Sequence, residues 1–354
     1  MPPSKPNENL AQAPFDDAHA DVILRSSDQV HFRVYKLILS LASPVFADTF
    51  SIPAPPSESP GDEVQVVTLT EDATALEVAL RHIYPVQTTP PEVEKLRYAS
   101  ILAEFARKYQ VESLNRFITG YLTDSIEFDP VGVYAIAVAY EYKDIGANAA
   151  RSCLNLPFSS LQNPYLRCAA AEHILELVRY HVACAEAASA LASSDLTWFS
   201  SLGQNKIIGH ITSQRGAYWH CNSCSTASIP QSSTSPEGNG TRSLMRSFGP
   251  RCLWNYLYRS ALVLAHHPSA EAVTTEAFVL QTNDCSSCAQ DMRVHILEIS
   301  VVLGREIRNT VKQVSLSLYP LSRSCDVQWY IQVPLPKGVS VDLVEPSSAA
   351  PITN

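Results

Sequence analysis

Two pairs of cysteines have the spacing of metal ligands. Cys221 and Cys224 form the first pair and Cys285 and Cys288 the second, with two residues inside each pair. This spacing lets both thiolates of a pair reach one cation, and four thiolates fill the tetrahedral shell of Zn²⁺ without an open position for a substrate. The pairs therefore predict one structural zinc that staples a loop-rich region and performs no chemistry.

The long separation between the two pairs leaves other interpretations open. The pairs could belong to two unrelated loops of reduced cysteines, and His220 offers an alternative ligand to one thiolate, or is a surface histidine. A thioredoxin-like redox pair is disfavoured because neither pair follows a βαβ pattern. The remaining cysteines lie in apolar or helical surroundings and are interpreted as core residues; they are Cys153, Cys168, Cys184, Cys252 and Cys325.

The charge and the motifs exclude several classes of function. The chain has 35 acidic and 26 basic residues and a net charge of −9, which disfavours nucleic-acid binding. No apolar run approaches the roughly 20 residues of a membrane span, and no export signal is expected. Phosphate-loop, nucleophile-elbow, zincin and kinase motifs do not occur in the sequence. We therefore expect a non-enzymatic protein of the reducing cytosol or nucleus, with an uncharacterised enzyme as the remote alternative.

The first third of the chain alternates strand and helix signals. Residues 1–17 contain early prolines without periodicity and predict a disordered N-terminus. A strand hairpin should follow from Asp21, with its turn at residues 26–29. Ser43 and Pro44 should open a helix as N-cap and first residue, and Thr70 should cap another that ends at Tyr84. The expected elements are completed by a strand at residues 64–69 and by helices at 93–109 and 111–122.

The rest of the chain has mainly helical periodicity. We expect helices at residues 128–142, 147–154, 165–191, 253–265, 269–280 and 289–316, and a Ser/Pro-rich linker at 225–250. The last of these helices has an apolar stripe typical of core packing. The predicted organisation is an α+β domain at residues 18–125, helical regions at 126–220 and 221–333, and a loose tail at 334–354.

The α+β region resembles BTB/POZ domains. Its opening follows the family pattern Asp-Val-x-Leu, a turn, Phe-x-Val-His-Lys-x-x-Leu and Ser-Pro-x-Phe, with Tyr35 in place of the histidine. Residues 80–85 resemble the family's Leu-x-x-Ile-Tyr helix, and residues 106–114 its closing Ala-x-Lys-Tyr segment. The residues that carry the resemblance are expected to have structural roles; they are Asp21, Phe32, Tyr35, Lys36, Ser43, Pro44, Phe46, Tyr84, Lys108 and Tyr109.

The resemblance implies a function in protein–protein interaction. Residues 128–154 are similar to the BACK-like region that follows the domain in large fungal BTB families, where paired cysteines also occur. Members of the BTB family self-associate, commonly as homodimers, and dock partner proteins. The resemblance therefore implies a substrate adaptor for a cullin-type ubiquitin ligase, or alternatively a scaffold or transcription-related regulator.

Overall fold

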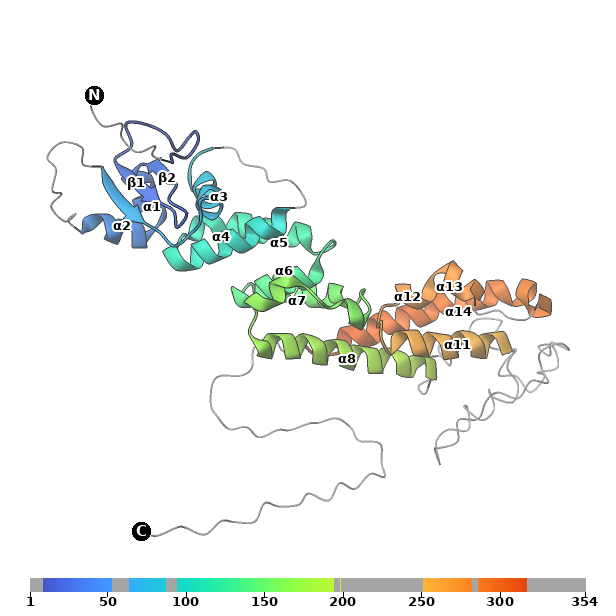
Figure 1. Cartoon of the computed structure of the whole chain (residues 1–354). Coiled ribbons are helices and arrows are strands. Elements are labelled where there is room, and N and C mark those ends of the chain that lie inside the picture. The colour runs from blue at the N-terminus through green and yellow to red at the C-terminus, as the bar shows by residue number, and fades with distance from the viewer. Residues whose placement is uncertain are drawn as a thin grey trace, which may run out of the picture. The chain divides into compact units, whose positions relative to one another are not determined.

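A computed structural model of the chain describes residues 9–52, 64–86, 94–193, 198, 251–281 and 286–316. Within these residues an α+β part comes first and a helical part follows, which confirms the predicted fold class (Figure 1). The predicted linker at 225–250 and the tail at 334–354 lie outside the described residues. In the described part, no helix combines the length and the apolar character needed to cross a membrane.

A small mixed sheet forms the centre of the α+β part. Strands β1 (Val22–Arg25) and β2 (His31–Val34) make the predicted antiparallel hairpin, and β3 (Gln65–Thr68) pairs parallel to β1. The strand order is therefore β2-β1-β3. Gln29 closes the hairpin turn with a φ of 67°. Because β1 lies between the other two strands, most of its side chains are buried.

The segment before the hairpin belongs to the fold, so the prediction of a disordered N-terminus is wrong for residues 9–17. The N–H of Ala11 donates to the carbonyl of His31 at 2.9 Å, and that of Arg33 donates to the carbonyl of Phe15 at 2.8 Å. Phe15 is fully buried, and its ring lies 5.9 Å from that of Phe32. Pairing with the edge of β2 orders this stretch, and such a long-range contact leaves no periodicity in the local sequence.

Helices α1 (Lys36–Ala42) and α2 (Pro44–Ser51) lie between β2 and β3 in the chain, and α3 (Ala73–Ile83) follows β3. Ser43 caps α2 as predicted, because its Oγ accepts the N–H of Phe46 at 3.1 Å. Helix α3 has Asp72 as its N-cap, with the carboxylate accepting the N–H of Ala75 at 2.8 Å. The prediction of Thr70 as this cap is therefore wrong.

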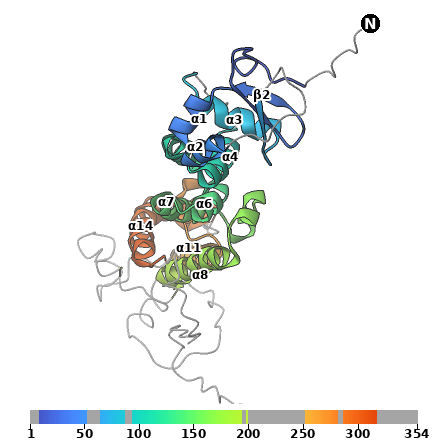
Figure 2. The same ribbon diagram turned by 90° about the vertical axis from the view of Figure 1, so that its left-hand side faces the viewer.

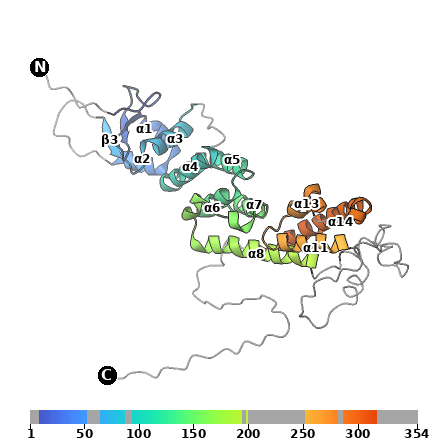
Figure 3. The same cartoon turned by 45° about the vertical axis from the view of Figure 1, so that its right-hand side comes forward.

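Two further helices close the α+β part and are visible side by side in Figure 3. They are α4 (Lys95–Tyr109) and α5 (Asn115–Ser125), with the short 3-10 helix η2 (Glu112–Leu114) between them. Gln110 ends α4 in the left-handed region with a φ of 54°. The predicted helix at 111–122 is thus a 3-10 turn followed by an α-helix.

The middle of the chain is helical, with boundaries that differ from the prediction. Its elements are α6 (Pro130–Ala139), α7 (Lys143–Cys153), the 3-10 helices η3 (Phe158–Ser160) and η4 (Pro164–Cys168), and α8 (Ala171–Ser193). Helix α6 ends three residues early because Glu141 has a φ of 65°. Residues 165–168 form η4 and not the start of α8. Figure 2 shows α6 and α7 packed side by side.

The last described helices are α11 (Arg251–Leu264), α12 (Glu271–Thr274), α13 (Glu276–Gln281) and α14 (Ser286–Gln313). The helix predicted at 269–280 is two short helices, because Thr275 has an extended backbone between them. The apolar stripe of α14 is buried as predicted at Ile296, Ile299, Leu303 and Ile307.

The buried side chains form two clusters that meet along α8. The first cluster runs from the sheet through α3 to α7 and includes Tyr180 and Cys184 of α8. The second contains Ala188 and Leu191 of α8 and extends over α11 to α14. The first core is therefore continuous across residue 126, where the sequence analysis placed a domain boundary.

Candidate functional site

The residues that carried the resemblance link elements of the α+β part to one another. The carboxylate of Asp21 accepts the backbone N–H of Lys36 at 2.7 Å, which fixes the start of α1 against β1. The N–H of Tyr35 donates to the hydroxyl of Tyr84 at 2.8 Å. The hydroxyl of Tyr35 donates to the carboxylate of Asp17, and this hydrogen bond raises the pKa of Tyr35. Tyr35 thus makes polar contacts of its own where the family pattern has histidine.

A second set of contacts joins α2 to the end of α4. The hydroxyl of Ser43 donates to the carbonyl of Tyr109 at 2.5 Å, and Pro44 occupies the first position of α2. The ring of Phe46 stacks on that of Tyr109 with centroids 4.7 Å apart. Phe32 is likewise in the core, with only 2% of its surface exposed. These side chains therefore have structural roles in the packing of the domain.

Lys108 and Tyr109 converge on one carboxylate at the base of α3. Lys108 Nζ donates to Glu71 Oε1 at 2.6 Å, and the hydroxyl of Tyr109 donates to Glu71 Oε2 at 2.7 Å. Burial acts to raise the pKa of Glu71, but the two hydrogen bonds outweigh burial and hold that pKa below its usual value. Every hydrogen-bonding group in this cluster has a structural partner, so the cluster locks α4 to the α3 segment.

The cysteine pairs lie almost wholly outside the described residues. Cys221, Cys224 and Cys285 are not among them, and Cys288 is described only as backbone in the first turn of α14. The zinc site therefore stays a prediction. In the part of the chain that the structure describes, no three His, Cys, Asp or Glu side chains gather as metal ligands.

The other cysteines are mostly core residues, as expected. Cys153, Cys184 and Cys252 are buried, and burial raises the pKa of the Cys153 thiol to about 12 and that of Cys184 to about 11. Cys168 is exposed at the end of η4, so its interpretation as a core residue is wrong. Cys325 lies outside the described residues.

One face of α1 is apolar and uncovered. The side chains of Leu37 and Leu41 are 69% and 80% exposed, whereas Leu39 between them is fully buried. Positions four apart share a helix face, so the two exposed leucines form a continuous strip. Ile52, directly after α2, is also 66% exposed. Single exposed leucines are ordinary, but a strip of them on a short helix marks an interaction surface.

The α1 strip also lacks charge. The only charged residue of α1 is Lys36, whose ammonium lies 5.9 Å from the centre of the Phe50 ring. A surface of leucines without carboxylates can meet a copy of itself without like-charge repulsion.

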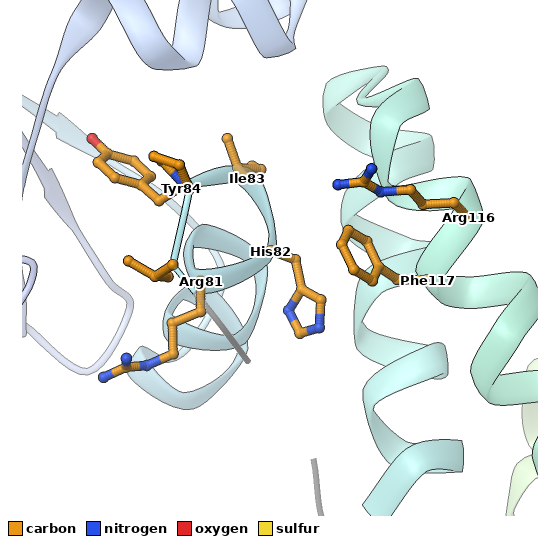
Figure 4. Close-up of a pocket in the computed structure, with 8 residues that line it drawn as sticks. Arg81, His82, Ile83, Tyr84, Arg116 and Phe117 are labelled. Carbon is orange, nitrogen blue, oxygen red and sulfur yellow. The ribbon is translucent and has the colours of Figure 1, made fainter. Parts of the chain in front are cut away.

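A recess of about 300 Å³ lies where α3 ends (Figure 4). Its walls come from the end of α3, from the two residues after Tyr84, and from the start of α5. In Figure 4 the rings of His82 and Phe117 approach each other from the two helices, with centroids 4.9 Å apart. The lining residues are Arg81, His82, Ile83, Tyr84, Pro85, Val86, Arg116 and Phe117.

The recess combines an apolar floor with two arginine side chains. The guanidinium of Arg116 lies 4.5 Å from the centre of the Phe117 ring, whereas that of Arg81 points away from Arg116 and pairs with Glu77 at 2.8 Å (Figure 4). His82 offers no free base, because its Nδ1 lies 2.7 Å from the carbonyl of Val78 and burial lowers its pKa. This composition is more typical of a surface that binds the side chains of a partner protein than of a catalytic site.

The comparison with protein families agrees with this geometry. Residues 12–126 match the BTB/POZ domain family. The N-terminal third of this chain is therefore a BTB/POZ domain, a class of domain that works as a protein–protein interaction module. No curated protein matches the chain.

Sequence reasoning identified the motif residues but missed the surfaces. Leu37 and Leu41 lie in a stretch where almost every residue is apolar, so the sequence gives no sign of which leucines face solvent. Arg81 and Arg116 are far apart in sequence and line one recess only because the end of α3 lies beside the start of α5. The one local signal was the i, i+4 spacing of the two leucines, which indicates a shared helix face. That face could be recognised as the exposed one only after the structure showed that Leu39 is buried.

Proposed function

We propose that this chain is a protein-interaction adaptor that self-associates through the α1 strip of Leu37 and Leu41. The single observation that supports self-association most directly is the exposure of these two leucines on a helix without acidic residues. In a twofold dimer each α1 would face the α1 of the second copy, so the same strip serves both partners. Burying both leucines from each copy removes four large apolar side chains from water.

The recess at the end of α3 is proposed to dock a second, different protein. It is built from α3 and α5, whereas the strip is on α1, so one domain offers two separate surfaces. An adaptor needs this separation, because it must bind a partner while remaining self-associated. We propose a subunit of a cullin-type ubiquitin ligase as the partner, acting in the cytosol or nucleus, with a scaffold or transcription-related role as the alternative.

The oligomeric state tests self-association. Multi-angle light scattering should give the full-length protein about twice the 38.8 kDa mass of one chain. The double variant Leu37→Glu/Leu41→Glu should be monomeric while keeping its helical circular dichroism. The control is Leu175→Glu/Val182→Glu on α8, whose side chains are also exposed. A monomeric wild type, or equal dissociation of the control, would contradict the proposal.

Affinity purification distinguishes the adaptor from its alternative. The tagged wild type and the Arg116→Glu variant should be compared in cells of the native organism. Recovery of a cullin by the wild type, and its loss with Arg116→Glu, would support the adaptor. Recovery of chromatin-associated proteins without a cullin would favour the transcription-related role.

A further inference from the structure

A groove of about 440 Å³ lies between the start of α3, the first half of α4 and the 3-10 helix η4. It is distinct from both surfaces described above, because none of its lining residues belongs to α1 or to the end of α3. Six of its nine lining residues carry polar or charged side chains, set in walls whose exposed surface is largely apolar. The lining residues are Asp72, Thr74, Ala75, Arg97, Ser100, Ile101, Pro164, Tyr165 and Arg167.

Two guanidinium groups reach this groove from different elements. Arg97 is on α4 and Arg167 is on η4, and both side chains are exposed. Among the described residues, neither guanidinium makes a hydrogen bond or an ion pair. Both act on Tyr165: burial and the carboxylate of Asp129 raise the pKa of its hydroxyl, and the positive charges of Arg97 and Arg167 oppose that rise. Both arginines therefore line the groove within electrostatic reach of the Tyr165 hydroxyl.

Hydroxyl groups complete the polar lining. Thr74, Ser100 and Tyr165 each bring a hydroxyl that has no hydrogen-bond partner within the described residues. The only carboxylate in the lining is Asp72, and one of its oxygens accepts the N–H of Ala75 as the cap of α3. Donors therefore outnumber acceptors, which is the balance that suits an anion.

We infer that this groove binds an acidic segment of a partner polypeptide, with a carboxylate held between Arg97 and Arg167. Guanidinium groups are planar and match the two oxygens of a carboxylate. The groove is much larger than one carboxyl group, and Ile101 and Pro164 give it an apolar surface for the neighbouring residues of a peptide. Because the chain carries a net charge of −9, an acidic partner is attracted by this local site and not by the protein as a whole.

This inference goes beyond the proposed function. It assigns a third surface, at the junction of the BTB/POZ domain with the helices behind it, and it does not depend on self-association. The monomeric Leu37→Glu/Leu41→Glu variant should therefore bind the acidic peptide as well as the wild type does, so failure of one proposal leaves the other intact.

Fluorescence anisotropy with two defined peptides tests the inference. The probes are fluorescein-labelled peptides of alternating Glu and Leu, and of alternating Gln and Leu, added to the full-length protein. The wild type should bind the Glu peptide at least about tenfold more tightly than the Gln peptide. The variant Arg97→Gln/Arg167→Gln should bind the Glu peptide about tenfold or more weakly than the wild type does. The reason is that each substitution removes a hydrogen bond between two charged groups, and losing one such bond weakens binding by about tenfold.

A charge-matched control separates the groove from general electrostatics. Arg259→Gln/Arg305→Gln removes two exposed arginines of the C-terminal helices and should change the affinity by less than about twofold. Asp72→Asn keeps an N-cap residue while removing the one carboxylate of the lining. It should tighten the Glu peptide by about two- to fivefold.

Three results would overturn the inference. The first is equal binding of the Glu and Gln peptides by the wild type. The second is an equal loss of affinity in the groove variant and the control variant, which would show non-specific attraction. The third is calorimetric binding of inorganic phosphate that is tighter than that of the Glu peptide, which would show a small-anion site. Circular dichroism of each variant establishes that it is folded.

Discussion

At the scale of single residues, the family pattern selects side chains that connect elements. Ser43, Tyr84 and Tyr109 each make a hydrogen bond to a residue distant in the sequence. Their types could be matched to the pattern without knowing these partners. The role of each residue could not be read from the sequence. A hydroxyl group can cap a helix, join two elements or face solvent, and the residue type is the same in all three cases.

His82 is a buried histidine at the contact of α3 with α4 and α5. It is 6% exposed, and its Nδ1 and Nε2 lie 2.7 Å and 2.9 Å from the carbonyl of Val78 and the hydroxyl of Tyr121. The rings of Tyr98 and Phe117 also pack against it. The neutral imidazole satisfies both contacts, with Nδ1 donating and Nε2 accepting. Burial lowers the pKa of His82 below its usual 6.5, so the folded protein resists its protonation.

Stability should therefore fall in mild acid. The unfolded chain takes up this proton as the pH falls through about 6.5, whereas the folded chain does so only at lower pH. The free energy of unfolding is thus highest above pH 6.5 and decreases below it. Urea denaturation at pH 7.5 and pH 5.5 should show this decrease, and His82→Gln should reduce it.

His181 belongs in the same experiment as a second contributor. It is 1% exposed, and burial lowers its pKa as well. The double variant His82→Gln/His181→Gln should have the smallest pH dependence of the series. An unchanged decrease in both variants would show that neither histidine is responsible.

At the scale of elements, a capping side chain marks the start of α2, α3 and α6. Asp129 caps α6, because its Oδ1 accepts the N–H of Gly132 at 2.9 Å. The amide of Asn163 donates to the same carboxylate at 2.7 Å, which joins the loop before η4 to the start of α6. One carboxylate thus sets a helix start and the path of a distant loop.

Removing this carboxylate should destabilise the chain measurably. Asp129→Ala loses both the cap and the partner of Asn163 and should cost about 1–2 kcal/mol in the free energy of unfolding. Asp129→Asn keeps a capping oxygen and should cost less. Urea denaturation measures both variants. Equal losses in Asp129→Ala and Asp129→Asn would show that the cap itself contributes nothing.

Helix starts were predictable only where the capping residue has no competitor nearby. Ser43 stands directly before Pro44, and the structure begins α2 there. Thr70 and Asp72 are both favourable N-cap residues and lie within one short stretch. Tertiary contacts determine which of the two caps α3. Thr70 instead accepts a hydrogen bond from Lys108, which leaves Asp72 to cap α3.

At the scale of the whole molecule, α8 links the two hydrophobic cores. Its first half belongs to the core that runs from the BTB/POZ domain through α7, and its second half belongs to the core with α11 to α14. A single helix that serves two cores couples their stabilities, because unwinding it exposes apolar residues of both.

The zinc site is a prediction about the C-terminal core. Protein purified without chelator should contain about one zinc per chain by elemental analysis, bound by Cys221, Cys224, Cys285 and Cys288. Cys221→Ser and Cys285→Ser should each lower the metal content and the melting temperature. Cys168→Ser changes an exposed cysteine outside the pairs and should alter neither quantity. Absence of metal from the wild type would remove the site.

The sequence by itself determined the identity of the N-terminal domain, the strand hairpin, the order of the elements and the buried stripe of α14. These features depend on local periodicity and on residue types at short spacing, which the chain displays directly. Only the tertiary structure decided that residues 9–17 belong to the fold, which leucines of α1 face solvent, and that Arg97 and Arg167 line one groove. These features depend on contacts between distant segments, and the sequence does not encode such a contact in any local pattern.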